Sequence, residues 1–209
     1  MIRFVVITFI VYKYAIKNRL KVPKHYFKTI RKYEDAVKTP HRIIRISWFY
    51  GSIKDNLNAS SAIPFCVFLK KSWIPKIVFE NTDVVFKAFK GTVGHELTHK
   101  NNDMRSYKYK AVDRLFINKV NEVHADFGAA EKMFSNSRQI LLETISYKMS
   151  LIKKPSVDKI HPTWEQRYNY VYNFNFDESL IRQIAADVSC TNGELIQKVI
   201  NYFDEIYLS

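Results

Sequence analysis

Residues 94–99 have the sequence Gly-His-Glu-Leu-Thr-His, which is the pattern H-E-x-x-H inside a stretch typical of a helix. Because positions i and i+4 lie on one face of a helix, His95 and His99 can bind one metal ion. Glu96 is then placed beside any water that the metal holds. Imidazole pairs suit zinc, and a catalytic zinc needs a third protein ligand and an open position for water. The stretch therefore predicts one Zn²⁺ per chain, with a third ligand from elsewhere.

A second stretch, residues 121–126, has the sequence Asn-Glu-Val-His-Ala-Asp. Glu122 lies 23 positions after His99, which leaves room for one helix to end and another to return antiparallel. Glu122 and Asp126 are four residues apart and share a helix face, where a buried carboxylate is costly without a cation or a donor. We expect Glu122 on the metal and Asp126 on the free N–H of a ligand histidine. His124 is two positions from Glu122, so it points elsewhere and is predicted not to be a ligand.

The third stretch, residues 161–167, has the sequence His-Pro-Thr-Trp-Glu-Gln-Arg. With the first two stretches, it resembles the gluzincins, and more narrowly the zinc endopeptidases of the HtpX and CAAX prenyl protease type. Those enzymes carry a His-Pro-Ser/Thr-x-x-x-Arg box after the ligand glutamate. The resemblance covers about residues 55–172, and the three motifs occur in the family's order. The dipeptide Asn58-Ala59, which precedes the predicted strands, also fits the family loosely.

The resemblance implies zinc on His95, His99 and Glu122, with Glu96 as general base. Asp126 would orient a ligand histidine. His161 and Arg167 would be cleft residues that steady the oxyanion or the ligand carboxylate. Better-known members of the family carry several membrane-spanning helices, whereas this chain has at most one short candidate.

The order of the predicted elements indicates an α+β fold. We expect a small N-terminal antiparallel sheet followed by a mostly helical, zincin-like metallopeptidase domain, in which the active-site helix carries H-E-x-x-H. Residues 1–20 form a separate apolar and basic segment, and residues 21–209 form one domain. The predicted strands are residues 42–50, 63–69 and 75–80, with a loop at 55–61. The predicted helices are residues 24–38, 83–101, 107–134 (with a break near 118–121), 137–153, 163 onward, 177–188 and 191–207.

Caps are predicted for several of these helices. Asp83 can cap the helix that carries the H-E-x-x-H stretch. The pairs Thr163 with Gln166 and Thr191 with Glu194 have the spacing of capping boxes.

Composition excludes several other classes of protein. Only five glycines occur among 209 residues, and they form no phosphate-binding loop of the P-loop or dinucleotide type. No G-x-S-x-G elbow is present. The two cysteines form no C-x-x-C pair, which leaves both a disulfide scaffold and a cysteine zinc site unsupported.

The net charge of +13 is concentrated at the N-terminus. Residues 1–33 carry nine Lys or Arg and no acid, which leaves 24 basic and 20 acidic residues in the remainder. Residues 4–12 are apolar apart from Thr8, yet this run is shorter than the roughly 20 residues of a spanning helix. Three interpretations stay open: a short membrane anchor followed by a cytoplasmic polybasic segment, a buried strand, or a helix packed on the domain. The expected location is the cytoplasm or the cytoplasmic face of a membrane.

The function predicted from these patterns is hydrolysis of a peptide or protein substrate by a zinc-dependent endopeptidase. One strand before the zinc helix, 63–69 or 76–80, is expected to pair with the substrate. The alternative is a non-catalytic, zinc-containing module that binds membrane or, less favoured, nucleic acid through residues 1–33. A structural zinc site normally uses four protein ligands and cysteines, which favours the enzyme.

Overall fold

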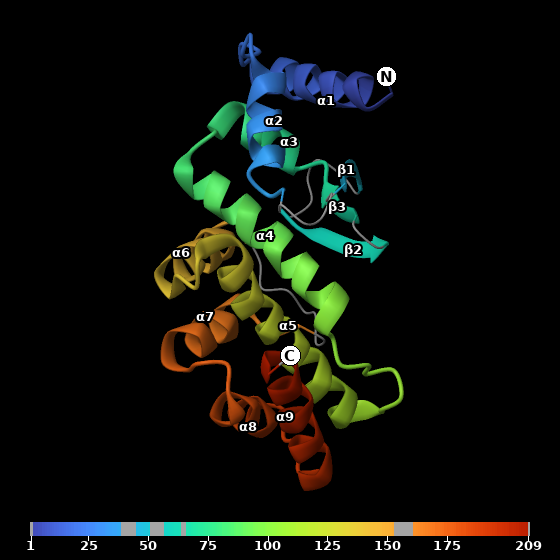
Figure 1. Cartoon of the computed structure of the whole chain (residues 1–209). Coiled ribbons are helices and arrows are strands. Elements are labelled where there is room, and N and C mark those ends of the chain that lie inside the picture. The colour runs from blue at the N-terminus through green and yellow to red at the C-terminus, as the bar shows by residue number, and fades with distance from the viewer. Residues whose placement is uncertain (1, 39–44, 51–56, 64–65, 153–160, 209) are drawn as a thin grey trace.

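The computed structural model describes residues 2–38, 45–50, 57–63, 66–152 and 161–208, and within them the chain is mostly helical with one small sheet (Figure 1). This confirms the α+β class. The N-terminal elements are α1 (Ile2–Asn18), α2 (Tyr26–Asp35), β1 (Arg45–Tyr50), β2 (Ala59–Ile63), β3 (Cys66–Lys70), α3 (Trp73–Pro75) and the π-helical turn η1 (Lys76–Glu80). The helices that follow are α4 (Asp83–Asn102), α5 (Ala111–Phe134), α6 (Arg138–Ser150), α7 (Trp164–Asn173), α8 (Glu178–Asp187) and α9 (Gly193–Leu208).

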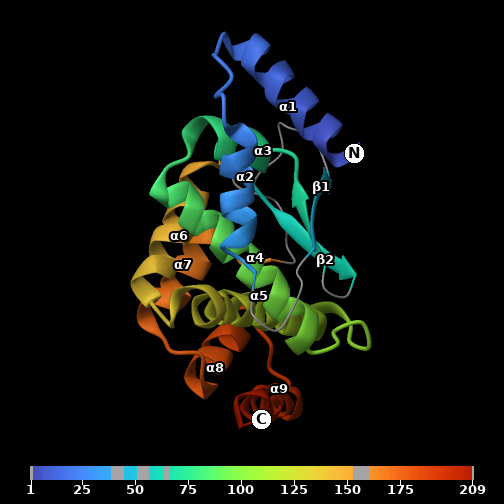
Figure 2. The same ribbon diagram turned by 45° about the horizontal axis from the view of Figure 1, so that its top comes forward.

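Within the described residues the sheet has three strands in the order β1-β3-β2, which makes β3 central and β2 an edge strand. The prediction of an antiparallel sheet is correct for the pair β2 and β3 and wrong for the pair β1 and β3, which is parallel, so the sheet is mixed. β2 also contacts α4, and Figure 2 shows the two side by side. The prediction of a loop at residues 55–61 is wrong for 59–61, which belong to β2. Of the predicted elements, residues 42–44, 55–56, 64–65 and 153 lie outside the described part of the chain.

The prediction of a strand at residues 75–80 is wrong, because α3 and η1 occupy this part of the chain. Trp73, Ile74, Ile77 and Val78 are buried, and their spacing of one and four residues is that of a helix face. Pro75 is tolerated in a first turn, where its missing N–H is not needed. The β-branched composition suggested a strand, but burial of one helical face determined the structure.

Residues 2–18 form helix α1, one of the three interpretations left open by the sequence. Its buried face consists of Ile7, Ile10, Val11 and Ala15. The first three of these join the core of α2, α3 and the first half of α4. In the described residues, no helix is both long enough and apolar enough to cross a membrane.

Several helix boundaries differ from the predictions because a different side chain makes the cap. Thr82, rather than Asp83, accepts the Val85 N–H at the start of α4. Asn192, rather than Thr191, accepts the Leu195 N–H at the start of α9. Helix α5 begins at Ala111 and is continuous through residues 118–121. The predicted Thr163 and Gln166 capping box of α7 is confirmed.

The most extensive packing between two elements joins α4 and α5, which two glycines bring close together. A Cβ at Gly94 would lie 2.7 Å from Met133 Cγ and 3.0 Å from Ala129 Cα. A Cβ at Gly128 would lie 2.4 Å from Thr98 Oγ1, and Thr98 is fully buried. The α4–α5 contact is therefore fixed at a distance that larger side chains would not allow.

Gly128→Ala should lower the free energy of unfolding by about 1–3 kcal/mol, because the added methyl overpacks this contact. Urea denaturation followed by circular dichroism measures the change. Gly193→Ala is the matched control, since no atom lies within 4 Å of the added Cβ and little change is expected. A second substitution, Thr98→Ala, should recover part of the loss by removing the two nearest atoms. Equal stability of Gly128→Ala and the wild type would contradict this view of the contact.

Candidate metal centre

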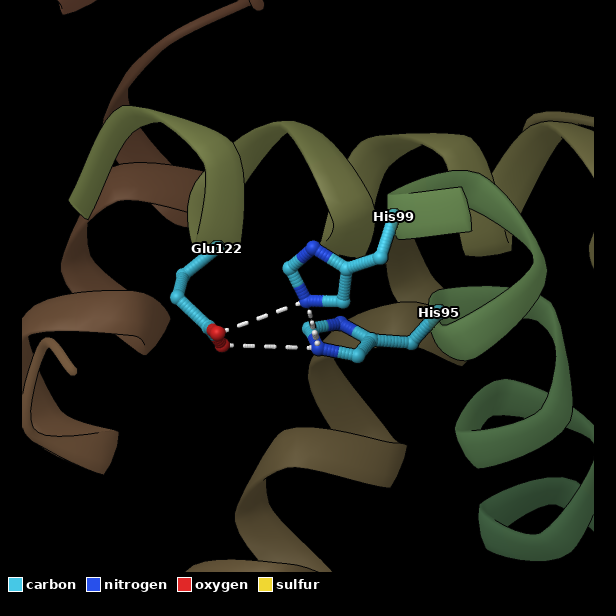
Figure 3. Close-up of side chains that lie close together, drawn as sticks. All are labelled: His95, His99 and Glu122. Carbon is cyan, nitrogen blue, oxygen red and sulfur yellow. Dashed lines mark hydrogen bonds and ion pairs between the residues drawn. The ribbon is translucent and has the colours of Figure 1, made fainter. Parts of the chain in front are cut away.

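His95, His99 and Glu122 form a compact group, hereafter the ligand cluster, between α4 and α5 (Figure 3). One turn of α4 separates the two histidines, so both rings leave the same face of that helix. Glu122 enters from the facing side of α5. The close α4–α5 packing thus brings together three residues that the sequence predicted as ligands.

The distances within the ligand cluster fit a single metal ion. One potential ligand atom from each residue lies within 4.8 Å of the others. The two Nε2 atoms of His95 and His99 are 2.9 Å apart, and they lie 3.4 and 3.3 Å from the Glu122 oxygens. Tetrahedral zinc with bonds of 2.0–2.1 Å would separate its ligand atoms by about 3.3 Å. Three ligands of this type also leave one position for a water molecule, as in catalytic rather than structural zinc sites.

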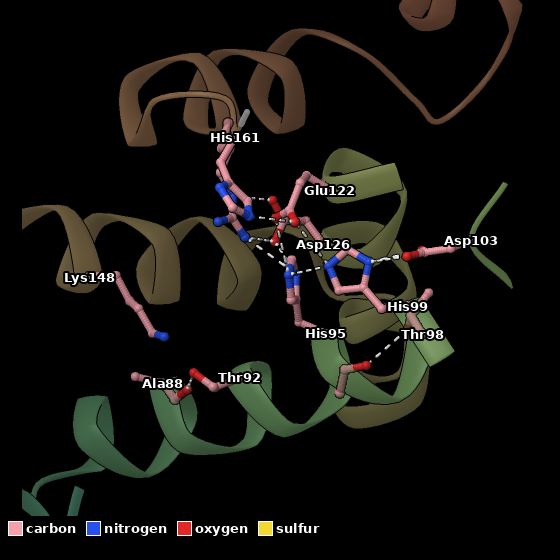
Figure 4. Close-up of polar contacts among 12 residues, drawn as sticks. Ala88, Thr92, His95, Thr98, His99, Asp103, Glu122, Asp126, Lys148 and His161 are labelled. Atoms are coloured by element: carbon pink, nitrogen blue, oxygen red, sulfur yellow. Dashed lines mark hydrogen bonds and ion pairs between the residues drawn. The ribbon is translucent and has the colours of Figure 1, made fainter. Parts of the chain in front are cut away.

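Each ligand histidine has a carboxylate on its other ring nitrogen (Figure 4). His95 Nδ1 lies 3.0 Å from Asp126 Oδ1, which is the contact predicted for Asp126. His99 Nδ1 lies 2.9 and 3.1 Å from the two oxygens of Asp103. A carboxylate at Nδ1 holds the proton there, which leaves the Nε2 lone pair for a metal. The ligand cluster is therefore oriented for coordination through Nε2.

Arg167 is buried at the wall of the site, where its guanidinium contacts Asp126 and lies 3.3 Å from His95 Nδ1. Its Nε donates to Asp126 Oδ2 at 2.7 Å, and its Nη2 donates to Asp126 Oδ1. The guanidinium also lies over the ring of Trp164, 4.1 Å from the centroid. Such a two-point contact fixes the carboxylate strongly. Arg167 therefore positions Asp126, which in turn positions His95.

His161 precedes α7 and contacts the ligand cluster directly, with Nε2 3.2 Å from Glu122 Oε1. It is half exposed, so it lies at the border between the cluster and solvent. Of the two roles that the family resemblance offered, the structure places His161 beside the ligand carboxylate. The same arrangement leaves its ring at the mouth of the site.

The protonation of the two buried carboxylates follows from their partners. Burial alone would raise the pKa of Glu122, but hydrogen bonds from His161, His95 and His99 hold this pKa well below its ordinary value. The contacts from His95 and His99 run through Nε2 atoms that carry protons, and a metal ion bound there would take the place of those protons. Burial opposes ionisation of Asp126 as well, and the charge of Arg167 together with the His95 contact lowers its pKa. Both groups are therefore anionic at neutral pH, as a metal ligand and its outer partner must be.

His124 lies apart from the ligand cluster. Its ring packs against Phe176 and Phe203, with centroids 4.9 and 4.7 Å away. Burial lowers the pKa of His124 to about 3, so its imidazole is neutral. This position agrees with the prediction that His124, two residues after Glu122, points away from the ligand cluster.

The sequence interpretation assigned no role to Asp103 or Asn121, although both organise the site. The Asn121 side chain accepts from Met104 N at 3.0 Å and donates to Met104 O at 2.9 Å, which ties the segment after α4 to α5. Tyr202 donates to the Asp103 carbonyl at 3.1 Å. The signal for Asp103 was present, because it lies four residues after His99 and thus one helical turn away.

A cavity of about 680 Å³ opens beside the ligand cluster. Its described walls come from β2, α4, α5, α6 and the start of α7. Glu96, Arg167 and His161 line it, together with Asn58, Ala59 and Ser60 at β2. The site thus combines a group fit for a metal with room for a ligand.

Comparison with known proteins gave no relative. No protein family model matches the sequence, no curated protein matches it, and no solved structure matches the fold. The likeness to HtpX-type endopeptidases therefore depends on the three sequence motifs alone.

Glu122→Ala should abolish or strongly weaken zinc binding, because it removes one of three protein ligands. Elemental analysis after dialysis should find about one zinc ion per chain in the wild type. Glu131→Ala is the matched control, since this exposed glutamate lies on the same helix. Equal zinc content in the wild type and Glu122→Ala would remove Glu122 from the ligand set.

Asp103→Asn should weaken zinc binding by about 10–100-fold, because the amide holds the His99 ring less well. Competition with a fluorescent chelator measures the dissociation constant. Asp204→Asn changes the same charge at an exposed position of α9 and should leave affinity unchanged. An unchanged affinity in Asp103→Asn would show that this contact does not orient His99.

Proposed function

We propose that the chain is a zinc-dependent endopeptidase of zincin-like architecture. The observation that carries the proposal is the ligand cluster with a carboxylate behind each histidine, beside a cavity that Glu96 also lines. When bound, zinc lowers the pKa of a coordinated water towards about 7 and polarises a substrate carbonyl. His95, His99 and Glu122 would hold the ion, and the low pKa of Glu122 keeps its carboxylate ready for this task.

Glu96 is the proposed general base. It follows His95 directly on α4 and lines the cavity. It would take a proton from the attacking water as the oxygen adds to the peptide carbonyl carbon. It would then deliver this proton to the leaving nitrogen as the C–N bond breaks, so that one water is consumed for each bond cleaved. Arg167 and Asp126 would keep His95 in place throughout.

The edge strand β2 is the proposed place for the substrate backbone. The sequence suggested residues 63–69 or 76–80, but 76–80 are helical and β3 has neighbours on both sides. β2 has a neighbour on one side only among the described strands, and residues 58–60 line the cavity. An extended peptide could therefore add to β2 and pass the ligand cluster.

Glu96→Gln should keep zinc and lose hydrolysis of an unfolded protein such as casein, by about 10²–10⁴-fold. Release of acid-soluble peptides measures the rate, and a chelator should stop the wild type. Glu165→Gln is the matched control, because Glu165 also lines the cavity but lies outside the ligand cluster. Full activity in Glu96→Gln would contradict the mechanism. Zinc without hydrolysis in the wild type would favour the non-catalytic alternative.

We also propose that α1 lies on an anionic membrane surface, at the cytoplasmic face where such lipids are found. Its solvent side bears an apolar stripe at helical spacing: Val5, Phe9, Tyr12 and Ile16 are 50–78% exposed. Basic residues flank this stripe, including Lys13 and Lys17 on α1 itself. An apolar stripe beside cationic side chains is the pattern of a helix that lies in the interface.

Wild-type protein should sediment with vesicles that contain phosphatidylserine and much less with neutral vesicles. Added salt should weaken the binding, because screening reduces attraction between basic residues and lipid. Phe9→Glu with Ile16→Glu should weaken it by at least about tenfold, since two apolar side chains no longer enter the lipid. Tyr172→Glu, at an exposed aromatic residue on α7, is the control. No vesicle binding would overturn this proposal, and a dimer without vesicles would assign the stripe to self-association.

A further inference from the structure

Lys148 is a cation that the proposed reaction does not use, although it lines the same cavity as the ligand cluster. Its side chain extends from α6 towards α4, on the side of Thr92 (Figure 4). Lys148 is only 8% exposed. Its Nζ donates to the Leu57 carbonyl at 2.5 Å and lies 5.4 and 5.7 Å from the ring centroids of Trp73 and Trp164.

The charge of Lys148 has no carboxylate at ion-pair distance among the described residues. Arg167, the other buried cation of the cavity, is by contrast neutralised by its two contacts to Asp126. Burial lowers the pKa of Lys148 to about 7, and the Arg167 charge adds to this effect against the opposing charges of Glu96 and Asp126. A buried ammonium is costly unless it meets an anion. One donor is used by Leu57, which leaves capacity for a ligand.

We propose that Lys148 is the charged end of a substrate subsite that takes a carboxylate close to the scissile bond. The inference rests on the peptidase function proposed above and specifies its substrate class. The anion would be an Asp or Glu side chain or a C-terminal carboxylate, since both offer the same two oxygens. The rings of Trp73 and Trp164 flank the Lys148 ammonium, and Leu141, Ile145 and Met149 of α6 line the same cavity. Apolar neighbours of this kind strengthen a charge-assisted hydrogen bond.

Lys148 could instead stabilise the charge of Glu96, because the two groups interact: the negative charge of Glu96 raises the pKa of Lys148. The two roles predict different kinetics. A subsite cation discriminates between substrates, so its loss lowers kcat/KM for acidic substrates alone. A residue that only supports Glu96 affects all substrates alike. Selectivity is therefore the informative measurement, rather than the rate for any one peptide.

The experiment uses the full zinc-loaded chain and peptides cut from casein by the wild type. Each scissile sequence is synthesised with Glu, Gln or Lys at every position within three residues of the cleaved bond. A further set has an amidated C-terminus, which separates a side-chain carboxylate from a terminal one. The enzymes are wild type, Lys148→Met and Lys148→Gln, with Lys132→Met as a control of equal charge change at an exposed site on α5.

The wild type and Lys132→Met should prefer Glu over Gln at one position by about tenfold or more in kcat/KM, the size expected for a hydrogen bond to a charged group. In Lys148→Met and Lys148→Gln this ratio should fall to within about twofold, with kcat for the Gln peptide retained. If amidation rather than Gln substitution reduces cleavage, the carboxylate is terminal. Equal ratios in wild type and variants, or an equal loss of kcat on all peptides, would overturn the subsite.

Binding to the zinc-loaded Glu96→Gln protein provides a readout without turnover. Fluorescence anisotropy compares peptides of casein sequence that have Glu or Gln at each position, with and without Lys148→Met. A preference for Glu that depends on Lys148 would support the subsite even if no peptide were hydrolysed, in which case the proposed function alone would fail. Hydrolysis without any preference for a carboxylate would leave the peptidase standing and overturn the subsite. Thermal melts of each variant confirm that the protein is folded.

Discussion

The close contact between α4 and α5 is the constraint on which the rest of the structure depends. Thr98 fills the space left by Gly128, and Gly94 receives Met133 and Ala129 from the opposite helix. The same two helices carry the ligand cluster, in which the Glu122 oxygens lie 3.4 and 3.3 Å from the His95 and His99 rings. His95 and His99 flank Thr98 on α4, so residues that set the helix distance and residues of the ligand cluster alternate along one helix.

A chain of charges then orients the ligand cluster. Arg167 fixes Asp126, Asp126 holds His95, and Asp103 does the same for His99 from the opposite side. Each buried carboxylate thus faces a cation or an N–H donor, which offsets the cost of its burial. The buried ammonium of Lys148 differs from these carboxylates, because no anion of the described residues lies at ion-pair distance from it. A buried charge with spare donors in a cleft is a common mark of a functional position.

The sequence predicted the parts of the site whose chemistry depends on spacing along a helix. His95, His99, Glu122 and Asp126 each occupy an i, i+4 relation, which fixes direction before tertiary structure is known. Arg167 was placed in the cleft by its motif, but its partner Asp126 could not be chosen without knowing how α7 approaches α5.

The errors lie where long-range packing decides the outcome. Residues 75–80 have strand-like composition, yet they bury one helical face against α1 and α2. The parallel pairing of β1 with β3 depends on how the chain crosses between them, which no local pattern specifies. Lys148 was overlooked because one lysine on an amphipathic helix usually reaches solvent. Its spacing from Leu141 and Ile145 places it on the buried face instead.

The ligand cluster also lies where two parts of the core meet. The first half of α4 packs with α1, α2 and η1, whereas the first half of α5 packs with α8 and α9. A metal ion held by both helices would close a loop between His99 and Glu122, and so act on the chain as a covalent cross-link does. Because the ion would bind the folded chain and not the unfolded one, its binding would also raise the free energy of unfolding. The ion would couple the core around α1, α2 and η1 to the core around α8 and α9, so that local unfolding of either one would destabilise the other.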